Sequence, residues 1–159
     1  KKQSQAADEK IKQAGSSQKK TIPQGNLNEA LFLNLDHPQW KDIEKRCLSC
    51  GNCTQVCPTC FCHREQDEPA LTGEASEHLR LWDSCFTTHH SYLLGMIVRK
   101  AIRLRYRQWL THKFGAWHEQ FGTSGCVGCG RCITWCPSKI DVTEELNVIC
   151  TKEGSHAEK

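Results

Sequence analysis

Eight of the twelve cysteines in this chain of 159 residues belong to a repeated pattern. The run C-x-x-C-x-x-C-x-x-x-C-P occurs first as CLSCGNCTQVCP and again as CVGCGRCITWCP. Cysteine thiolates at this spacing are ligands of [4Fe–4S] clusters. The sequence therefore predicts two such clusters with the ligands Cys47, Cys50, Cys53, Cys57, Cys126, Cys129, Cys132 and Cys136.

The spacing within each run also predicts which cysteines share a cluster. Three cysteines separated by two residues can wrap around one face of a cubane, whereas the fourth lies beyond that reach. In two-cluster proteins with this spacing, the fourth cysteine of one run binds the cluster of the other. We assign cluster 1 to Cys47, Cys50, Cys53 and Cys136, and cluster 2 to Cys126, Cys129, Cys132 and Cys57. Gly51 and Gly130 follow the second ligand of each run, where a backbone without Cβ can approach the inorganic sulfides.

Zinc sites and disulfides are the alternative uses of so many cysteines. Zinc ribbons use two CxxC pairs, whereas here two quartets share one unusual spacing and each ends in CP. The sequence shows no signal segment in which charged residues are followed by an apolar stretch. A secreted domain held together by disulfides is therefore the weakest interpretation. If the cysteines bound zinc, the chain would be an interaction module whose fold is held together by the metal, rather than a redox protein.

Four cysteines lie outside the two runs: Cys60, Cys62, Cys85 and Cys150. Cys60 and Cys62 extend the first run to CPTCFC, and Cys85 ends the string RLWDSC. These three could form a further metal site or a thiol pair. They could equally be small buried residues that tune the cluster potentials through weak S–H hydrogen bonds. Cys150 is interpreted as incidental.

Charge and hydropathy exclude several classes of function. The formal net charge is +3, but that count treats every thiol as neutral. Two clusters, each a doubly positive core with four thiolates, bring the charge of the loaded protein to roughly −1. We therefore expect no nucleic acid partner. No apolar stretch approaches membrane-spanning length, and we expect a cytoplasmic module, with the initial Lys1 fitting a piece of a longer chain.

Composition divides the chain into three parts. Residues 1–25 are rich in Lys, Gln and Ser, which predicts a flexible linker, a disordered segment or a frayed helix. Residues 26–150 carry both runs and are predicted to form the dicluster domain. Residues 151–159 are predicted to be a flexible tail.

Helices are expected to position the cysteines. One short helix is predicted from Leu27 and a second from Pro38, the latter running directly into the first cysteine run. Residues 63–77 are predicted to be a loop and residues 89–112 a long helix, while Asp141 should cap a final helix. No segment shows convincing strand alternation. The expected fold is mostly α, an α-helical ferredoxin-like dicluster domain with no substantial sheet.

The sequence contains no motif for catalysis by this chain alone. There is no glycine-rich dinucleotide loop, no P-loop and no CxxxCxxC run. A cluster held by four cysteines also has no open iron for a substrate. We expect an electron-transfer component of an oxidoreductase, or alternatively an iron–sulfur redox sensor whose free cysteines respond to oxidation.

Three strings in the chain resemble a known family: RCLSCGNCTQVCPTCFC, RLWDSC and GCVGCGRCITWCP. They are similar to the C-terminal dicluster module that the sulfhydrogenase beta subunit shares with the corresponding iron–sulfur subunit of anaerobic sulfite reductase. The lead-in HPQWKDIEKRC and the string RLRYRQWLTHKF also fit, so the resemblance covers about residues 36–145. More loosely, the chain resembles the α-helical ferredoxin domains found in the iron–sulfur subunits of succinate dehydrogenase and heterodisulfide reductase.

The resemblance implies a place in a hetero-oligomeric complex. In that family the module relays electrons between a flavoprotein subunit that handles NAD(P)H and a catalytic subunit, either nickel–iron hydrogenase or sirohaem sulfite reductase. Carried over to this chain, the eight ligands hold two [4Fe–4S] clusters, while the flavin and the catalytic metal belong to partners. The chain departs from the family in lacking its large N-terminal domain.

Overall fold

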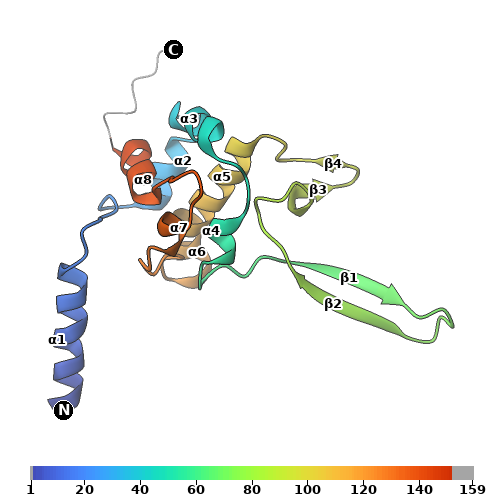
Figure 1. The fold of residues 1–159 in the computed structure, drawn as a ribbon, viewed down its shortest axis with the longest axis horizontal. Coiled ribbons are helices and arrows are strands. Elements are labelled where there is room, and N and C mark those ends of the chain that lie inside the picture. Colours follow the sequence, from blue (N-terminus) through green and yellow to red (C-terminus); the bar gives the residue numbers. More distant parts are fainter. Residues whose placement is uncertain (1, 152–159) are drawn as a thin grey trace.

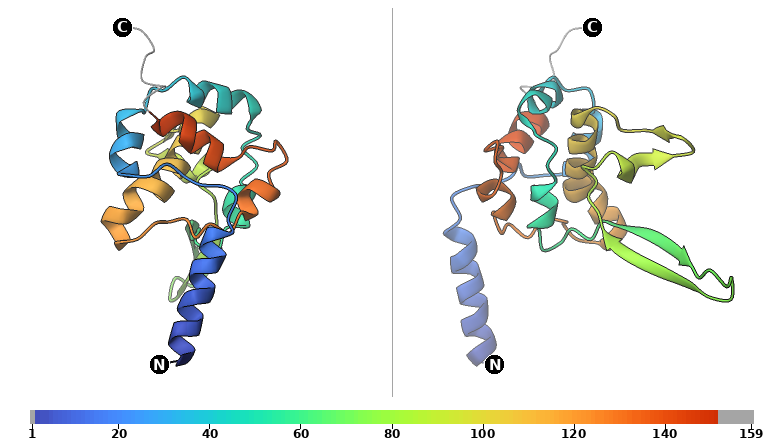
Figure 2. Two further views of the ribbon diagram at one scale, coloured as in Figure 1. Left: turned by 90° about the vertical axis from the view of Figure 1, so that its left-hand side faces the viewer. Right: turned by 45° about the vertical axis from the view of Figure 1, so that its right-hand side comes forward.

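The computed structural model describes residues 2–151. A body of short helices forms the centre of the molecule, with helix α1 projecting on one side and a long β-hairpin projecting on another (Figure 1). The right-hand view of Figure 2 shows the same separation of α1, the helical body and the hairpin. The predicted tail from residue 152 onward lies outside the described residues.

Helices supply most of the regular structure. In chain order they are α1 (Lys2–Ser16), α2 (Leu27–Leu33), α3 (Gln39–Arg46), α4 (Asn52–Gln55), the 3-10 turn η1 (His89–Ser91), α5 (Ile102–Thr111), the π-helical turn η2 (His112–Ala116), α6 (Trp117–Phe121), α7 (Arg131–Thr134) and α8 (Val142–Cys150). Between them lie two antiparallel pairs of strands: β1 (His63–Pro69) with β2 (Ser76–Trp82), and β3 (Tyr92–Leu93) with β4 (Met96–Ile97).

Helix starts at two places follow local sequence signals. Asn26 caps α2, because its side-chain oxygen accepts a hydrogen bond from the backbone N–H of Glu29 at 3.2 Å. Asp141 caps α8 in the same way, accepting from the N–H of Thr143 at 2.9 Å. Each cap satisfies a backbone donor that the helix itself leaves unpaired. The helices predicted at these two positions are therefore present.

The interval predicted to be a loop contains the longest strands of the molecule. Residues His63 to Pro69 pair with Ser76 to Trp82 in an antiparallel register. Their side chains are almost all exposed on both faces, so neither strand needs an apolar face. The alternation that normally identifies a strand is therefore missing from the sequence. The structure agrees with a mainly helical fold, and the expected lack of a substantial sheet holds only in the sense that its two sheets are small, with two strands each.

The predicted long helix over residues 89–112 is also wrong in its first half. Leu94 and Gly95 have φ values of 45° and 87°, which a right-handed helix does not allow. They form the turn between β3 and β4, and two successive positive φ values are typical of tight hairpin turns. Leu94 is 94% exposed rather than buried, and α5 begins only at Ile102.

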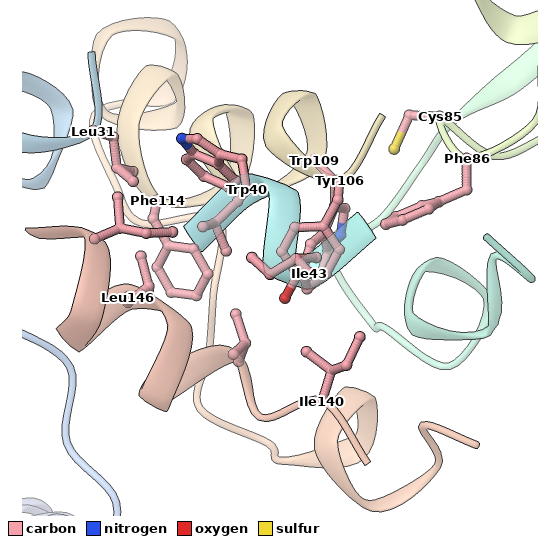
Figure 3. Close-up of a cluster of buried hydrophobic side chains, with 13 residues drawn as sticks. Leu31, Trp40, Ile43, Cys85, Phe86, Tyr106, Trp109, Phe114, Ile140 and Leu146 are labelled. Carbon is pink, nitrogen blue, oxygen red and sulfur yellow. The ribbon is translucent and has the colours of Figure 1, made fainter. Parts of the chain in front are cut away.

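The core is small and lies where α2, α3, α5, η2 and α8 meet (Figure 3). Six of its side chains have no accessible surface or almost none: Leu31, Ile43, Leu110, Phe114, Leu146 and Ile149. Glu145 of α8 is buried beside this core, and its carboxylate accepts hydrogen bonds from Gln39 at 2.7 Å and Arg46 at 2.8 Å. These contacts fix α3, which leads into the first cysteine run, against α8, which follows the second.

Helix α1 takes no part in this core. All of its described side chains are exposed, including Ile11 at 69%. The helix is continuous from Lys2 to Ser16 and extends away from the body (Figure 1). Isolated helices of this length gain little stability without packing. The assignment of residues 1–25 as a linker or frayed helix stays a prediction.

Candidate metal centre

The two cysteine runs fold into matching local structures. Gly51 and Gly130, at equivalent positions, have φ values of 73° and 70° and precede the short helices α4 and α7. This left-handed conformation favours glycine because a Cβ would be strained there. Helices α4 and α7 contact each other, and Asn52 donates a hydrogen bond to the carbonyl of Trp135 at 2.5 Å. The repeat in sequence is therefore a repeat in structure, with its halves side by side.

Two cavities adjoin these turns, and both are lined by cysteines from the two runs. Cys136 of the second run lines the first cavity with Cys47, Cys50 and Cys53, the first three cysteines of the other run. Cys57 of the first run lines the second cavity with Cys126, Cys129 and Cys132. The second cavity thus receives three cysteines from one run and the fourth from the other, and the first receives the corresponding set together with Cys132.

The cavities share one wall. Cys132, Trp109 and Val142 line both. Trp109 lies on α5 with only 4% of its surface exposed, and Tyr106 and Phe86 add further aromatic surface to the first cavity (Figure 3). Apolar walls of this kind limit the access of water to a bound group, and solvent access is one of the factors that set a cluster's potential.

Backbone N–H groups point at three of the sulfurs. Those of Ser49 and Gly128 donate to the cysteine two residues earlier, Cys47 and Cys126, both at 3.4 Å. The equivalence of these two bonds follows from the repeat. The N–H of Ile140 donates to Cys136 at 3.3 Å. Hydrogen bonds to a thiolate favour its charged form, the form that binds iron.

A buried lysine breaks the symmetry between the two cavities. The Lys113 ammonium lies 3.3 Å from the Cys57 sulfur and donates to Thr59 Oγ1 and the Gly125 carbonyl, both at 3.0 Å. Lys113 is only 5% exposed. Burial acts to lower its pKa, but the neighbouring Cys60 and Cys57 sulfurs outweigh burial and raise it, so the side chain is cationic. The sequence interpretation did not identify Lys113 as a site residue, since no spacing links it to either run.

The π-helical turn η2 places this lysine. It continues α5 with one extra residue in the turn, a feature that re-aims side chains and is frequent at functional sites. Gly125 packs directly on the turn: a Cβ there would lie 2.7 Å from the carbonyl oxygen of Lys113 and 2.8 Å from the Trp117 ring. Only glycine fits, so Cys126 is held next to η2.

The string RLWDSC anchors the first run. Ser84 is 1% exposed, and its hydroxyl shares a hydrogen bond of 2.7 Å with Thr54 Oγ1 of α4. Its oxygen would also lie 3.1 Å from a Cβ at Gly51. The carbonyl of Phe86 accepts from Ser49 at 3.0 Å. The segment that follows β2 is therefore joined to both ends of the turn that carries Cys50.

The thiols suit metal binding better than they suit remaining as free thiols. Burial raises the pKa of Cys132 to about 11 and also raises that of Cys53, because both sulfurs face apolar walls. Such thiols stay protonated without a cation, and a cation that displaces the proton supplies the compensating charge. Hydrogen bonding from Cys60 lowers the pKa of Cys57 to about 4. Soft thiolates in an apolar cavity are the donor set of iron–sulfur clusters.

The remaining cysteines have separate environments. Cys60 is close enough to Cys57, and Cys85 close enough to Cys62, to lower the pKa of that neighbouring thiol, and Cys150 is half-buried at the end of α8. Within residues 2–151, no three His, Cys, Asp or Glu side chains are arranged to hold a single metal ion. The three uses considered for Cys60, Cys62 and Cys85, as a further metal site, as a thiol pair or as buried residues that tune the clusters, stay predictions.

Among the described residues, no helix is both long enough and apolar enough to cross a membrane. No solved structure matches the chain.

Residues 46–140 match the family model of the 4Fe-4S dicluster domain, a span that includes all eight predicted ligands. The chain is also 34% identical to sulfhydrogenase 2 subunit beta of Pyrococcus furiosus over 139 residues, which is 86% of this chain and 40% of that protein. The chain thus spans less than half of the relative's length. The resemblance seen in the cysteine strings is confirmed by both comparisons.

These matches settle the cofactor and the general role. The chain binds two [4Fe–4S] clusters and has an iron–sulfur electron-transfer role. The two cysteine-lined cavities are of the kind that such a pair of clusters requires. The chain is a member of the 4Fe-4S dicluster domain family.

Proposed function

We propose that the chain relays single electrons through its two clusters, from an NAD(P)H-linked flavoprotein to a catalytic subunit such as a hydrogenase or a sulfite reductase. The observation that carries the proposal is the shared wall between the two cavities, to which Cys132 contributes. Two redox centres that adjoin in this way can exchange electrons directly. When bound, the clusters supply the one-electron chemistry, and the protein determines their spacing and potentials.

The ligands in this proposal follow the exchanged pattern. Cluster 1 is held by Cys47, Cys50, Cys53 and Cys136, and cluster 2 by Cys126, Cys129, Cys132 and Cys57. The cavity linings support this division, because Cys136 lies among the first three cysteines and Cys57 among the last three. Exchange of the fourth ligand would keep the two clusters together as one unit.

Each cluster would have its own exposed edge for a partner. Cys50 and Cys129, the second ligands of the two runs, are both exposed. Beside them lie two apolar residues at equivalent positions, Leu48 at 67% and Val127 at 62% exposure. Exposed apolar side chains next to redox centres are suited to docking partner proteins. We propose that electrons enter at one of these edges and leave at the other.

The partners and the compartment are part of the same proposal. Sulfhydrogenase 2 subunit beta is by its name one subunit of a larger assembly, and we propose that this chain likewise works in a hetero-oligomeric complex. It would not be catalytic alone. We propose the cytoplasm as its compartment, because a reducing environment keeps cysteine thiolates available to iron.

The experiment is electron paramagnetic resonance of the anaerobically reduced full chain, with iron and acid-labile sulfide measured on the same sample. A relay with adjoining clusters predicts signals broadened by magnetic interaction between them. Two signals that behave independently would contradict the exchanged ligands. Turnover would then be tested with the co-purifying flavoprotein and NAD(P)H, and reduction of only one cluster would contradict the relay.

A further inference from the structure

The β1–β2 hairpin brings together two cysteines that lie far apart in the sequence. His63 pairs with Trp82 at its base, and the N–H of Asp83 donates to the Cys62 carbonyl at 3.1 Å, which extends the register by one residue. Cys62 therefore enters the hairpin next to the point where Cys85 leaves it. Figure 3 shows Cys85 at this end of the hairpin, beside Phe86.

The two thiols interact with each other. Both cysteines line the same two cavities, and Cys85 is close enough to the Cys62 sulfur to affect the pKa of that thiol. Hydrogen bonding from Cys85 lowers the pKa of Cys62 to about 6, and His90 contributes in the same direction. The pKa of Cys85 is raised in turn, because its proton is held in that hydrogen bond and its sulfur is buried. One sulfur is thus a ready nucleophile and the other a retained thiol, which are the complementary roles of an exchanging pair.

A pocket of about 260 Å³ opens onto both sulfurs. Its wall carries Arg99, His90 and His112 in addition to the two cysteines. The Nε atom of Arg99 is buried and has no hydrogen-bond partner in the structure. Arg99 nevertheless brings a positive charge to this wall, which suits a ligand with an anionic group. No acidic side chain lines this pocket.

The pair also lies next to the cluster site. Cys85 is close enough to Cys53 and Cys60 for their charges to affect its pKa. A second, narrower cavity is lined by Cys60, Cys62 and Cys85 together with Lys113, the lysine that contacts Cys57. The thiol pair therefore lies between an open pocket and ligands of both proposed clusters.

We propose that Cys62 and Cys85 are a redox-active dithiol that reduces a small organic disulfide carrying an anionic group, bound in this pocket. The proposal goes beyond the relay and uses its two clusters as the source of electrons. The Cys62 thiolate attacks one sulfur of the substrate, and the first thiolate leaves. The Cys85 thiol then loses its proton and attacks the Cys62 sulfur, the second thiolate leaves, and a Cys62–Cys85 disulfide forms.

Regeneration balances the reaction. Breaking the Cys62–Cys85 bond takes two electrons and two protons. Each reduced cluster gives up one electron, and the protons come from solvent. The sum is one disulfide, two electrons and two protons giving two thiols. The two one-electron centres therefore match the two-electron demand of this pair.

The test uses the anaerobic full chain with both clusters loaded and 5,5′-dithiobis(2-nitrobenzoate) as the anionic disulfide. The variants are Cys62→Ser and Cys85→Ser, with Cys150→Ser as the matched control outside the pocket. Wild type and control should release two coloured thiolates per bound probe and give a Cys62–Cys85 cross-linked peptide by mass spectrometry. The Cys85→Ser variant should stop at a mixed disulfide on Cys62. The Cys62→Ser variant should react with the probe at about one tenth of the wild-type rate or less.

Two further measurements bear on the pocket and on the electron source. Arg99→Gln should lower the rate of reaction with the anionic probe by about threefold or more. The rate of reaction with the neutral 2-hydroxyethyl disulfide should stay unchanged. In wild type with reduced clusters, the cross-link should disappear as the cluster absorbance returns to that of the oxidised state. An oxidised pair that persists beside reduced clusters would overturn the proposal.

Iron analysis separates this proposal from the relay. Unchanged iron and sulfide in both serine variants support a dithiol role, whereas loss of iron would mean that these cysteines are cluster ligands and would overturn it. If a variant does not fold, the peptide map of the wild type still decides, because absence of the cross-link contradicts the dithiol. Two magnetically interacting clusters in that same sample would leave the relay intact.

Discussion

The Lys113 ammonium and the Cys57 sulfur lie 3.3 Å apart in a region from which water is largely excluded. The equivalent cysteine of the other run, Cys136, receives a backbone N–H from Ile140 instead. One proposed cluster therefore has a full positive charge in contact with a ligand sulfur, whereas Arg105, the cation that acts on Cys47 of the other cluster, donates its Nε–H to Ser49 instead. A cation stabilises the reduced, more negative state of a cluster, so the relay should have two different potentials.

Replacement of Lys113 by methionine should lower the potential of cluster 2. A unit charge at an effective dielectric constant near 20 contributes a few kcal/mol, which corresponds to on the order of 100 mV for one electron. Potentiometric titration followed by electron paramagnetic resonance measures the shift. Lys41→Met on the exposed side of α3 is the control and should change neither potential. Equal shifts of both clusters would contradict the asymmetry.

The same lysine can identify which cysteines share a cluster. Cys50→Ser should impair cluster 1, and the cluster that remains should still respond to Lys113→Met because Cys57 is one of its ligands. Cys129→Ser should impair cluster 2 and leave a cluster that does not respond. Ligation within each run predicts the opposite pair of results, so the titration of the two double variants decides between the arrangements.

Truncation of Leu110 should destabilise the protein strongly. This side chain is fully buried between α5 and its neighbours, and Leu→Ala changes in a core cost about 2–5 kcal/mol from lost burial and the cavity left behind. Anaerobic urea unfolding followed by circular dichroism gives the free energy. Leu33→Ala, at a position that is 77% exposed, should stay within about 0.5 kcal/mol of wild type.

The cap of α8 should be worth about 1 kcal/mol. Asp141 accepts from the backbone and hydroxyl of Thr143 and pairs with Lys20. Asp141→Ala removes all three contacts, whereas Asp141→Asn keeps an acceptor for the helix N-terminus. Thermal unfolding should therefore rank aspartate above asparagine and asparagine above alanine. Equal stability of the alanine and asparagine variants would mean that the cap itself contributes nothing.

Removal of iron should loosen the whole centre of the molecule. Tyr106, Trp109 and Ile140 belong to the core and also line the first cavity, so loss of the cluster exposes one side of the core to water. Metal binding and folding are coupled in small metal-dependent domains. A chelator under reducing conditions should abolish the near-ultraviolet circular dichroism of these aromatic residues, and iron with sulfide should restore it. A near-ultraviolet spectrum that survives complete loss of iron would contradict this coupling.

The predictions that succeeded rest on local chemistry. The spacing of the two runs and the cap at Asp141 each involve residues a few positions apart. Such signals are complete within a short stretch of sequence, and the same geometry follows wherever the stretch is placed. The cofactor could therefore be predicted before the fold was known.

The predictions that failed concern segments whose structure depends on distant partners. The strands of the β1–β2 hairpin expose both faces, so no alternation revealed them. The apolar residues near Leu94 suggested a helix, but the turn at Leu94 and Gly95 ends any such pattern. The spacing of apolar residues indicates which side chains are buried, and in these two segments the side chains are mostly exposed.

The cysteine runs by themselves determined that this chain holds two clusters, because ligand type and spacing are covalent properties of the sequence. Tertiary structure alone decided what surrounds the sulfurs. It brought Lys113 to Cys57 and Cys62 to Cys85 through a π-helical turn and an antiparallel register. These contacts join residues separated by long stretches of chain, and only the packed fold brings them within hydrogen-bonding distance.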